Sequence, residues 1–219
     1  MTVYPRPRRG RIVTSMNNTN PKTTTWTIDA MHSAVGFRVR HMMVVNARGF
    51  FREVNGAVTY DASHPERTAI HVEIAAASLD TRVEARDAHL RNAEFFDVER
   101  YPIITFRSTH VRVQPAGELE VTGDLTIRDT TRAVTLSVSE ITKPQNDHNG
   151  RARIGASATA TIKRSDFGIT YNLVLEAGGI ALADDVALTF DMSLLQGDAG
   201  MLYARGPWRS STWMTSQSS

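Results

Sequence analysis

The sequence contains no cysteine among its 219 residues. This absence excludes disulfide bonds, thiolate metal sites and a cysteine nucleophile. No apolar run approaches the ~20 residues that a membrane-spanning helix needs. A secretory signal needs an apolar stretch of about 7–15 residues behind its basic start, and here Ile12 and Val13 are followed at once by Thr14 and Ser15. We therefore expect a cytoplasmic protein.

The net charge of +2 is unevenly distributed along the chain. Residues 1–25 carry five cations and no acid and residues 197–219 carry a net charge of +1, so the body between residues 26 and 196 has a net charge of −4. An acidic body argues against nucleic-acid binding. Polar residues dominate the two ends, and we expect disordered extensions at 1–24 and 197–219 around a folded domain at 25–196. Aromatic residues near the carboxyl end leave transient membrane contact open, and homodimerisation is also left open.

Helical periodicity is scarce, and runs with a period of two take its place. Such alternation of apolar and polar residues is typical of antiparallel strands wetted on one face. The expected strands cover residues 26–29, 35–40, 53–60, 70–74, 103–113, 119–127, 134–138, 153–162 and 186–192. About eight strands joined by short turns favour an all-β barrel or sandwich. The segment Thr81–Arg91 is the one predicted helix, with Asp80 or Thr81 as its cap and Val83, Ala88 and Leu90 on its buried side.

Small residues fall on the apolar parity of several strands. Ala156, Ala158 and Ala160 share one face of the strand at 153–162, and Gly56 and Gly123 hold equivalent places. An eight-stranded barrel is either filled by its own side chains or just wide enough for one ligand. Small inward residues favour the hollow barrel, whereas large residues such as Phe37 and Phe190 could fill it.

Several motifs occur in a familiar order. They are Trp26–Asp29 with His32-Ser33, Val35–Val39 with His41, Ser78–Thr81 with Arg86–Leu90, Glu94–Asp97 with Tyr101-Pro102, Val121–Ile127, Lys163–Gly168 and the strand at Asp184–Leu188. Over about residues 25–196 this order resembles the YceI family of polyisoprenoid-binding, lipocalin-like proteins. The resemblance implies an extended eight-stranded antiparallel barrel with one short α-helix at its rim. It also implies an apolar lumen that holds an isoprenoid lipid, such as a quinone or a polyprenyl phosphate.

The predicted function is therefore non-enzymatic binding, storage or transport of a long-chain isoprenoid, with no cofactor and no catalytic residues. Sequestration of other amphiphiles, such as fatty amides or lipophilic antibiotics, is an alternative. The predicted lumen residues are Phe37, Val39, His41, Val58, Ile70, Val72, Val121, Ala156, Ala158, Ala160, Phe167, Leu188 and Phe190. Strand bulges would exchange inward and outward faces.

Three polar residues of the helix are candidate head-group contacts: Arg86, Asp87 and His89. Arginine suits phosphate because its planar fork binds two oxygens, although Arg86 and Asp87 could instead tie the helix to the rim. An enzyme acting on lipid through His32, Asp87 or His89 is a further alternative, as is a filled barrel that binds partners through its outer face. The seven histidines show no metal-ligand spacing, so no metal site is expected. In the Arg164–Gly168 segment, Asp166 is expected to bond backbone amides at a structural corner.

Overall fold

Antiparallel strands make up most of the computed structural model, which describes residues 24–173 and 181–197. The predicted extensions at 1–24 and 197–219 lie, except for their innermost residues, outside the described part. The strands are β1 (Thr24–Ile28), β2 (Ala34–His41), β3 (Val45–Phe51), β4 (Val54–Tyr60), β5 (Ala69–Ala75), β6 (Leu79–Asp80), β7 (Ile103–Val113), β8 (Leu119–Ile127), β9 (Thr130–Ser139), β10 (Gln145–Asn146), β11 (Ala152–Lys163) and β12 (Leu182–Gln196).

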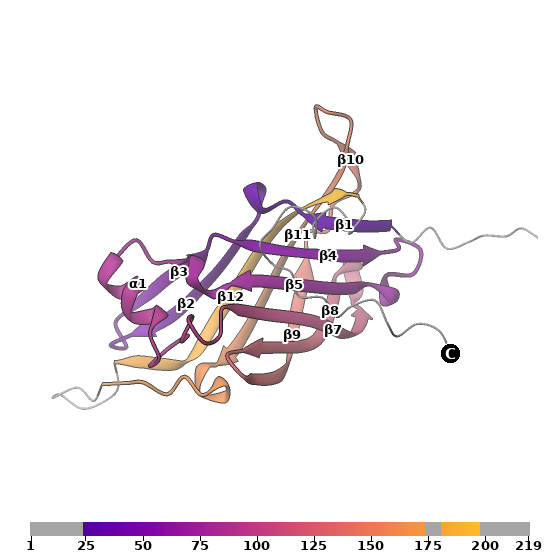
Figure 1. Cartoon of the computed structure of the whole chain (residues 1–219). Coiled ribbons are helices and arrows are strands. Elements are labelled where there is room, and N and C mark those ends of the chain that lie inside the picture. Colours follow the sequence, from indigo (N-terminus) through magenta and orange to yellow (C-terminus); the bar gives the residue numbers. More distant parts are fainter. Residues whose placement is uncertain (1–23, 174–180, 198–219) are drawn as a thin grey trace, which may run out of the picture.

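One α-helix, α1 (Glu84–Arg91), lies near one end of the sheet (Figure 1). Short 3-10 helices connect the strands: η1 (Ala30–His32), η2 (Pro65–Arg67), η3 (Ala76–Ser78), η4 (Pro115–Gly117) and η5 (Arg164–Phe167). Gly168 ends η5 at a φ of 72°, a backbone conformation that glycine adopts without steric cost.

The sheet closes on itself as a barrel of eight long antiparallel strands. The pairs β1/β2, β3/β4 and β5/β6 each form one long strand with an interruption. Both β1 and β2 pair with β12. On their other side, β4 pairs with β1 and β3 pairs with β2. The strands β7, β8, β9, β11 and β12 follow in order. The pairing of β11 with β12 closes the ring, so the predicted antiparallel barrel is confirmed.

Inward side chains along the strands are apolar, as the period of two predicts. In β8, for example, Leu119, Val121, Leu125 and Ile127 are buried while Asp124 is exposed. Each side chain of this kind contributes roughly 1.5–3 kcal/mol when fully buried. The inward faces of all eight long strands therefore form one apolar interior.

The strand β3 was not predicted. Its inward parity holds Val45, Ala47, Gly49 and Phe51, and the small Ala47 and Gly49 weaken the apolar alternation. The ring of Phe37 takes the space beside Gly49, where a Cβ would lie 2.4 Å from Phe37 Cζ. A glycine that makes room for a neighbouring ring thus belongs to a strand despite its low strand propensity.

The helix exists but begins later than predicted, at Glu84, with Val83 as its N-cap residue. The predicted caps are wrong: Asp80 accepts a hydrogen bond from the Arg82 backbone, and Thr81 donates to Asp87. Val83 and Ala88 are exposed, so their predicted burial is also wrong. Leu90 is half-buried and packs against the core. The helix is held by polar contacts at its start more than by an apolar face.

Candidate functional site

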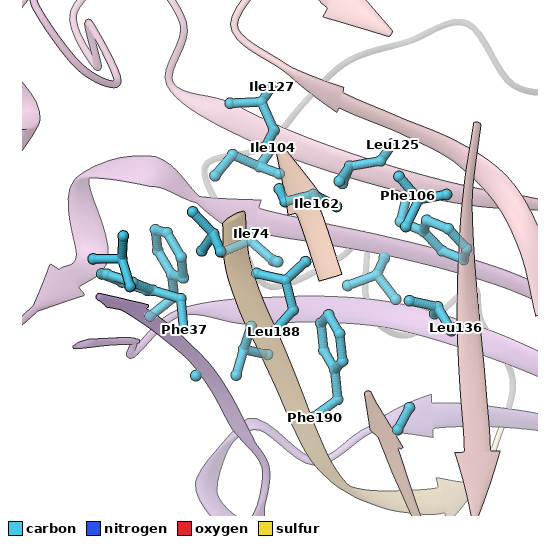
Figure 2. A pocket seen from close by; sticks show the side chains of 18 of the residues that line it. Phe37, Ile74, Ile104, Phe106, Leu125, Ile127, Leu136, Ile162, Leu188 and Phe190 are labelled. Carbon is cyan, nitrogen blue, oxygen red and sulfur yellow. The ribbon is translucent and has the colours of Figure 1, made fainter. Parts of the chain in front are cut away.

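The barrel encloses a cavity of about 700 Å³. Side chains from opposite walls point into it, with Phe37, Leu188 and Phe190 on one side and Ile104, Phe106 and Leu125 on another (Figure 2). Small-molecule sites in proteins typically measure about 300–1,000 Å³. The interior is therefore neither filled by its own side chains nor wide enough for an aqueous channel.

The cavity opens to solvent beside the turn between β2 and β3. At the opposite end of the barrel Leu119, Val138 and Ile154 border it and are all buried. At the other end Val45 is 57% exposed and Leu173 is 56% exposed, and both also border the cavity. Residues that touch both solvent and the interior mark a mouth, which lies beside the turn between β2 and β3.

Aromatic side chains narrow the cavity on the helix side. The ring of Phe51 lies 5.6 Å from that of Phe37 and 5.8 Å from that of Phe96, centroid to centroid. A second group joins His89, Phe95 and Tyr171, with centroid distances of 5.0–5.1 Å. All six rings border the cavity. Packing of this kind adds about 0.5–1.5 kcal/mol per ring pair beyond the buried area, so it fixes the shape of this part of the cavity.

Most polar side chains that border the cavity lie on the same side as the mouth. His41 comes from the β2–β3 hairpin, and Arg86 and His89 come from α1. The lining thus becomes cationic and hydrogen-bonding near the opening.

The structure brings almost all of the predicted lumen residues to the cavity wall. Those that border it are Phe37, Val39, His41, Val58, Ile70, Val72, Val121, Ala156, Ala158, Phe167, Leu188 and Phe190. Contact with a ligand stays a prediction for each of them. Ala160 is the exception: it packs against the core without bordering the cavity. It lies directly opposite Leu188 on β12, whose larger side chain presents the surface at this level.

The glycines of the apolar parity do not leave open space, which corrects the prediction made from them. A Cβ on Gly123 would lie 2.5 Å from Phe106 Cζ, and one on Gly56 would lie 2.9 Å from Ile28 Cδ1. Larger neighbours therefore already fill the room beside both glycines. The cavity owes its volume to the barrel itself and to alanines such as Ala156 and Ala158.

Of the three predicted head-group residues, two border the cavity. Arg86 donates from Nε and Nη2 to Thr81, and His89 Nε2 lies 2.7 Å from Glu94 Oε2. Asp87 does not border the cavity; it is buried, and its Oδ1 accepts hydrogen bonds from the backbone and hydroxyl of Thr81. The structure favours the alternative for Asp87, since its carboxylate ties the helix to the segment after β6.

The Arg164–Gly168 segment is a structural corner, as predicted, but a different acid holds it. Asp184, instead of Asp166, accepts hydrogen bonds from the backbone and hydroxyl of Ser165. These hydrogen bonds, with the Ser165 hydroxyl the largest influence, lower the pKa of Asp184. The guanidinium of Arg164 is buried against backbone carbonyls, and that burial lowers its pKa. Beside it Phe167 is fully buried and forms part of the cavity wall.

The residues considered for catalysis do not converge. His32 pairs with Asp29 at 2.8 Å and does not border the cavity, whereas His89 does. Within residues 24–173 and 181–197, no three His, Asp or Glu side chains come together as a metal site would require. No helix in this described part is long and apolar enough to cross a membrane.

Sequence reasoning missed several cavity residues: Phe51, Phe95, Phe96, Tyr171 and Arg48. Phe95 and Phe96 lie in the Glu94–Asp97 motif, whose two adjacent rings offered a signal. Tyr171 lies in an irregular segment after η5, where no periodicity could place it. Arg48 lies on the strand that was not predicted.

Fold and cavity together define a closed antiparallel barrel with a largely apolar interior that opens at one end. A solved structure of Burkholderia cenocepacia BcnA has this fold, with a TM-score of 0.66 and 24% identity over 76% of this chain and 98% of that one. A polyisoprenoid binding domain from Saccharophagus degradans matches with a TM-score of 0.56 and 16% identity, over 80% of this chain and 100% of that one.

The family follows from the sequence comparisons. The model of the YceI-like domain matches residues 26–194. UPF0312 protein SA2479 of Staphylococcus aureus strain N315 is 34% identical over 74% of this chain and 92% of its own length. The chain therefore belongs to the YceI-like family, and the predicted resemblance is confirmed.

Proposed function

We propose that the protein binds a long-chain isoprenoid lipid of quinone or polyprenyl phosphate type and stores or carries it without changing it chemically. The observation that carries this proposal is the enclosed apolar cavity of about 700 Å³ with a polar opening. The Saccharophagus domain of the same fold is described as polyisoprenoid binding, which agrees with the proposal.

The grading of the lining favours an amphiphile over a uniformly apolar guest. Burial of a hydrocarbon chain gives about 0.8 kcal/mol per CH2 group, so the apolar part alone supplies high affinity. The polar end then lies where His41, Arg86 and His89 border the cavity. Arginine binds phosphate oxygens in a bidentate manner, and imidazole can hydrogen-bond a quinone carbonyl.

Binding without chemistry is favoured by the way the polar residues are occupied. Asp87 is committed to Thr81, His89 to Glu94, and His32 to Asp29 at a different part of the fold. A general acid–base pair must lie within hydrogen-bond reach of one reacting group. The proposal therefore assigns Asp87 and His32 to structure, and His89 to structure and to head-group contact. A cytoplasmic location, no cofactor and no nucleic-acid partner are proposed with it.

The first test is to identify the occupant. The full chain is purified without detergent and denatured, and its organic extract is analysed by mass spectrometry. The proposal expects an isoprenoid quinone or polyprenyl phosphate in near-equimolar amount. A fatty amide or another amphiphile in the extract would support binding in the cavity but contradict the isoprenoid as the ligand. An extract without lipid from well-folded protein would contradict the whole proposal.

The second test places the ligand in the barrel. Ala158→Trp puts a large ring into the cavity, whereas Thr159→Trp puts the same ring on the outward face of the same strand. We expect the first variant to lose most of the co-purified lipid and the second to keep it, with both folded by circular dichroism. Ala156→Phe is a smaller alternative if Ala158→Trp does not fold. Equal lipid content in all folded variants would place the lipid outside the barrel.

A further inference from the structure

The turn between β2 and β3 exposes an unusual run of apolar residues. Val44 is 77% exposed and Met43 is 61% exposed, and Met42 and Val45 beside them are also exposed. Val45 borders the cavity as well, so this apolar tip adjoins the mouth. Leu173, a further exposed apolar residue, borders the cavity too, and its backbone is linked to the turn through Ala181. The tip and Leu173 form a contiguous apolar edge of the opening.

The backbone of the turn is poorly suited to the residues it contains. Met42 has a φ of 50° and Met43 a φ of 57°. Two successive residues at positive φ are the hallmark of hairpin turns that prefer Asn-Gly, and a bulky residue there costs folding energy. Neither methionine side chain gains burial in return. Asn-Gly would therefore make this turn more stable than Met42 and Met43 do. The two methionine side chains thus have a role other than stabilising the fold.

Cations line the outer face of the same hairpin. Arg38 lies directly opposite Arg48 in the register of β2 and β3, and Arg40 follows on the same face. Like charges placed opposite each other disfavour the pairing of strands. Within the described residues no carboxylate lies within ion-pair distance of these three arginines, and Arg40 Nε donates to the Met43 carbonyl at 3.2 Å.

We propose that the β2–β3 hairpin docks on the surface of an anionic phospholipid bilayer, with Met42, Met43, Val44 and Val45 inserted among the acyl chains and Arg38, Arg40 and Arg48 against the phosphates. Interfacial elements combine an apolar edge with basic residues in this manner. Each arginine near an anionic surface contributes about 1 kcal/mol, which is a factor of about five in binding. The surface relieves both costs of the free hairpin, the exposed methionines and the opposed arginines.

Docking in this orientation places the mouth of the cavity against the bilayer. A lipid could then pass between membrane and barrel without its hydrocarbon chain crossing water. The passage of lipid between membrane and barrel rests on the proposed function, whereas the docking itself does not.

The test is flotation of the full chain with vesicles of one part phosphatidylglycerol to two parts phosphatidylcholine, and with vesicles of phosphatidylcholine alone. Met42→Asn/Met43→Gly removes the apolar tip and supplies the residues that the turn prefers. Arg38→Gln/Arg48→Gln removes the opposed cations. The proposal expects each variant to bind the anionic vesicles at least about tenfold more weakly than the unmodified chain. It also expects Met42→Asn/Met43→Gly to unfold at the same or a higher temperature.

Arg112→Gln/Val113→Asn is the matched control. It removes one cation and one apolar residue that is 46% exposed, against 47% for Met42. Both residues lie at the end of β7 that pairs with the start of β8, away from the hairpin. The control should bind as the unmodified chain does. The basic amino-terminal residues are present in the unmodified chain and in every variant. Differences in vesicle binding among them therefore come from the substituted residues alone.

Equal vesicle binding by all variants, or no binding by the unmodified chain, would overturn the docking. A dimer in sedimentation that the Met42→Asn/Met43→Gly change dissolves, without vesicle binding, would also overturn it and identify the tip as a contact between copies. The results of this test can be distinguished from the results that test the proposed function. Vesicle binding with an empty cavity leaves the docking intact and contradicts the lipid carrier, and a filled cavity without vesicle binding does the reverse.

Discussion

The ring of Phe106 on β7 lies over Gly123 on β8, so that a Cβ on this glycine would be 2.5 Å from Phe106 Cζ and 2.4 Å from the Arg107 carbonyl oxygen. The carbonyl belongs to the backbone of the paired strand and has little freedom to move. Gly123→Ala should therefore destabilise the protein by about 1–3 kcal/mol through overpacking. Urea unfolding followed by tryptophan fluorescence measures the change.

Gly155 on β11 provides the comparison for that prediction. The nearest atom to a Cβ at this position is Thr142 Cγ2 at 3.6 Å, which is ordinary contact. Gly155→Ala should be neutral or slightly stabilising, because alanine restricts the unfolded chain. Similar losses for Gly155→Ala and Gly123→Ala would show that loss of glycine, and not the contact with Phe106, is the cause.

A second prediction concerns Arg164, whose guanidinium serves several backbone carbonyls at once. Its Nη1 donates to the carbonyls of Ile169 and Tyr171, each at 2.8 Å, and its Nε donates to that of Ala183 at 3.0 Å. A lysine keeps the charge but cannot reach these separate acceptors with one ammonium group. Arg164→Lys should cost about 2–3 kcal/mol, because buried carbonyls lose their donors.

The measurement for Arg164→Lys is chemical unfolding, with Arg132→Lys on the exposed face of β9 as the control. The control should change stability by less than about 0.5 kcal/mol. A similarly small effect at Arg164 would mean that water can replace its hydrogen bonds.

The barrel could be predicted because each long strand alternates apolar and polar residues, and such alternation survives whatever the strand pairs with. The run at 119–127 illustrates this, since β8 covers it residue for residue. The strand β3 could not be found in the same way, because Gly49 makes room for Phe37 and carries no apolar signal itself. That contact joins two strands and is invisible along one of them.

The cavity wall was predictable only where strand parity governs it. Phe37, Val39 and Leu188 follow from alternation alone, whereas Tyr171 lies in an irregular segment and enters the wall through tertiary packing. The role of Asp87 could not be predicted for a related reason. A polar residue in a recognisable motif can serve a head group or the backbone, and only the position of Thr81 decides between them.

Asp87 gives a third prediction. Its carboxylate accepts from the Thr81 backbone at 2.9 Å and from the Thr81 hydroxyl, and both residues are buried. Asp87→Ala leaves these donors without their acceptor and should cost about 2–3 kcal/mol. Because these hydrogen bonds hold α1 in place, backbone amide exchange should increase most in this helix, whose residues Arg86, His89 and Leu90 border the cavity.

Asp87→Asn is the informative partner of that variant, because its amide oxygen still accepts from Thr81. It should retain most of the stability that Asp87→Ala loses. Hydrogen exchange read by mass spectrometry tests both variants, and equal protection of α1 in Asp87→Ala and the unmodified protein would refute the role assigned to this carboxylate.

The last prediction follows from Asp29, whose Oδ2 accepts from Arg153 Nη1 at 2.6 Å and lies 2.8 Å from His32 Nδ1. Partial burial raises the pKa of Asp29, but the hydrogen bonds from Arg153 and His32 outweigh it and hold the pKa below the ordinary 3.8. A carboxyl group with a lowered folded-state pKa stabilises the fold above its unfolded-state value, and this contribution is lost as the pH falls through the folded-state pKa. The unmodified protein should thus be more stable than Asp29→Asn at about pH 6, and the gap should narrow as the pH falls through the folded-state pKa of Asp29. Unfolding free energies measured across this range, with the exposed Asp166→Asn as control, decide the matter, and a gap independent of pH would mean that Asp29 acts through shape alone.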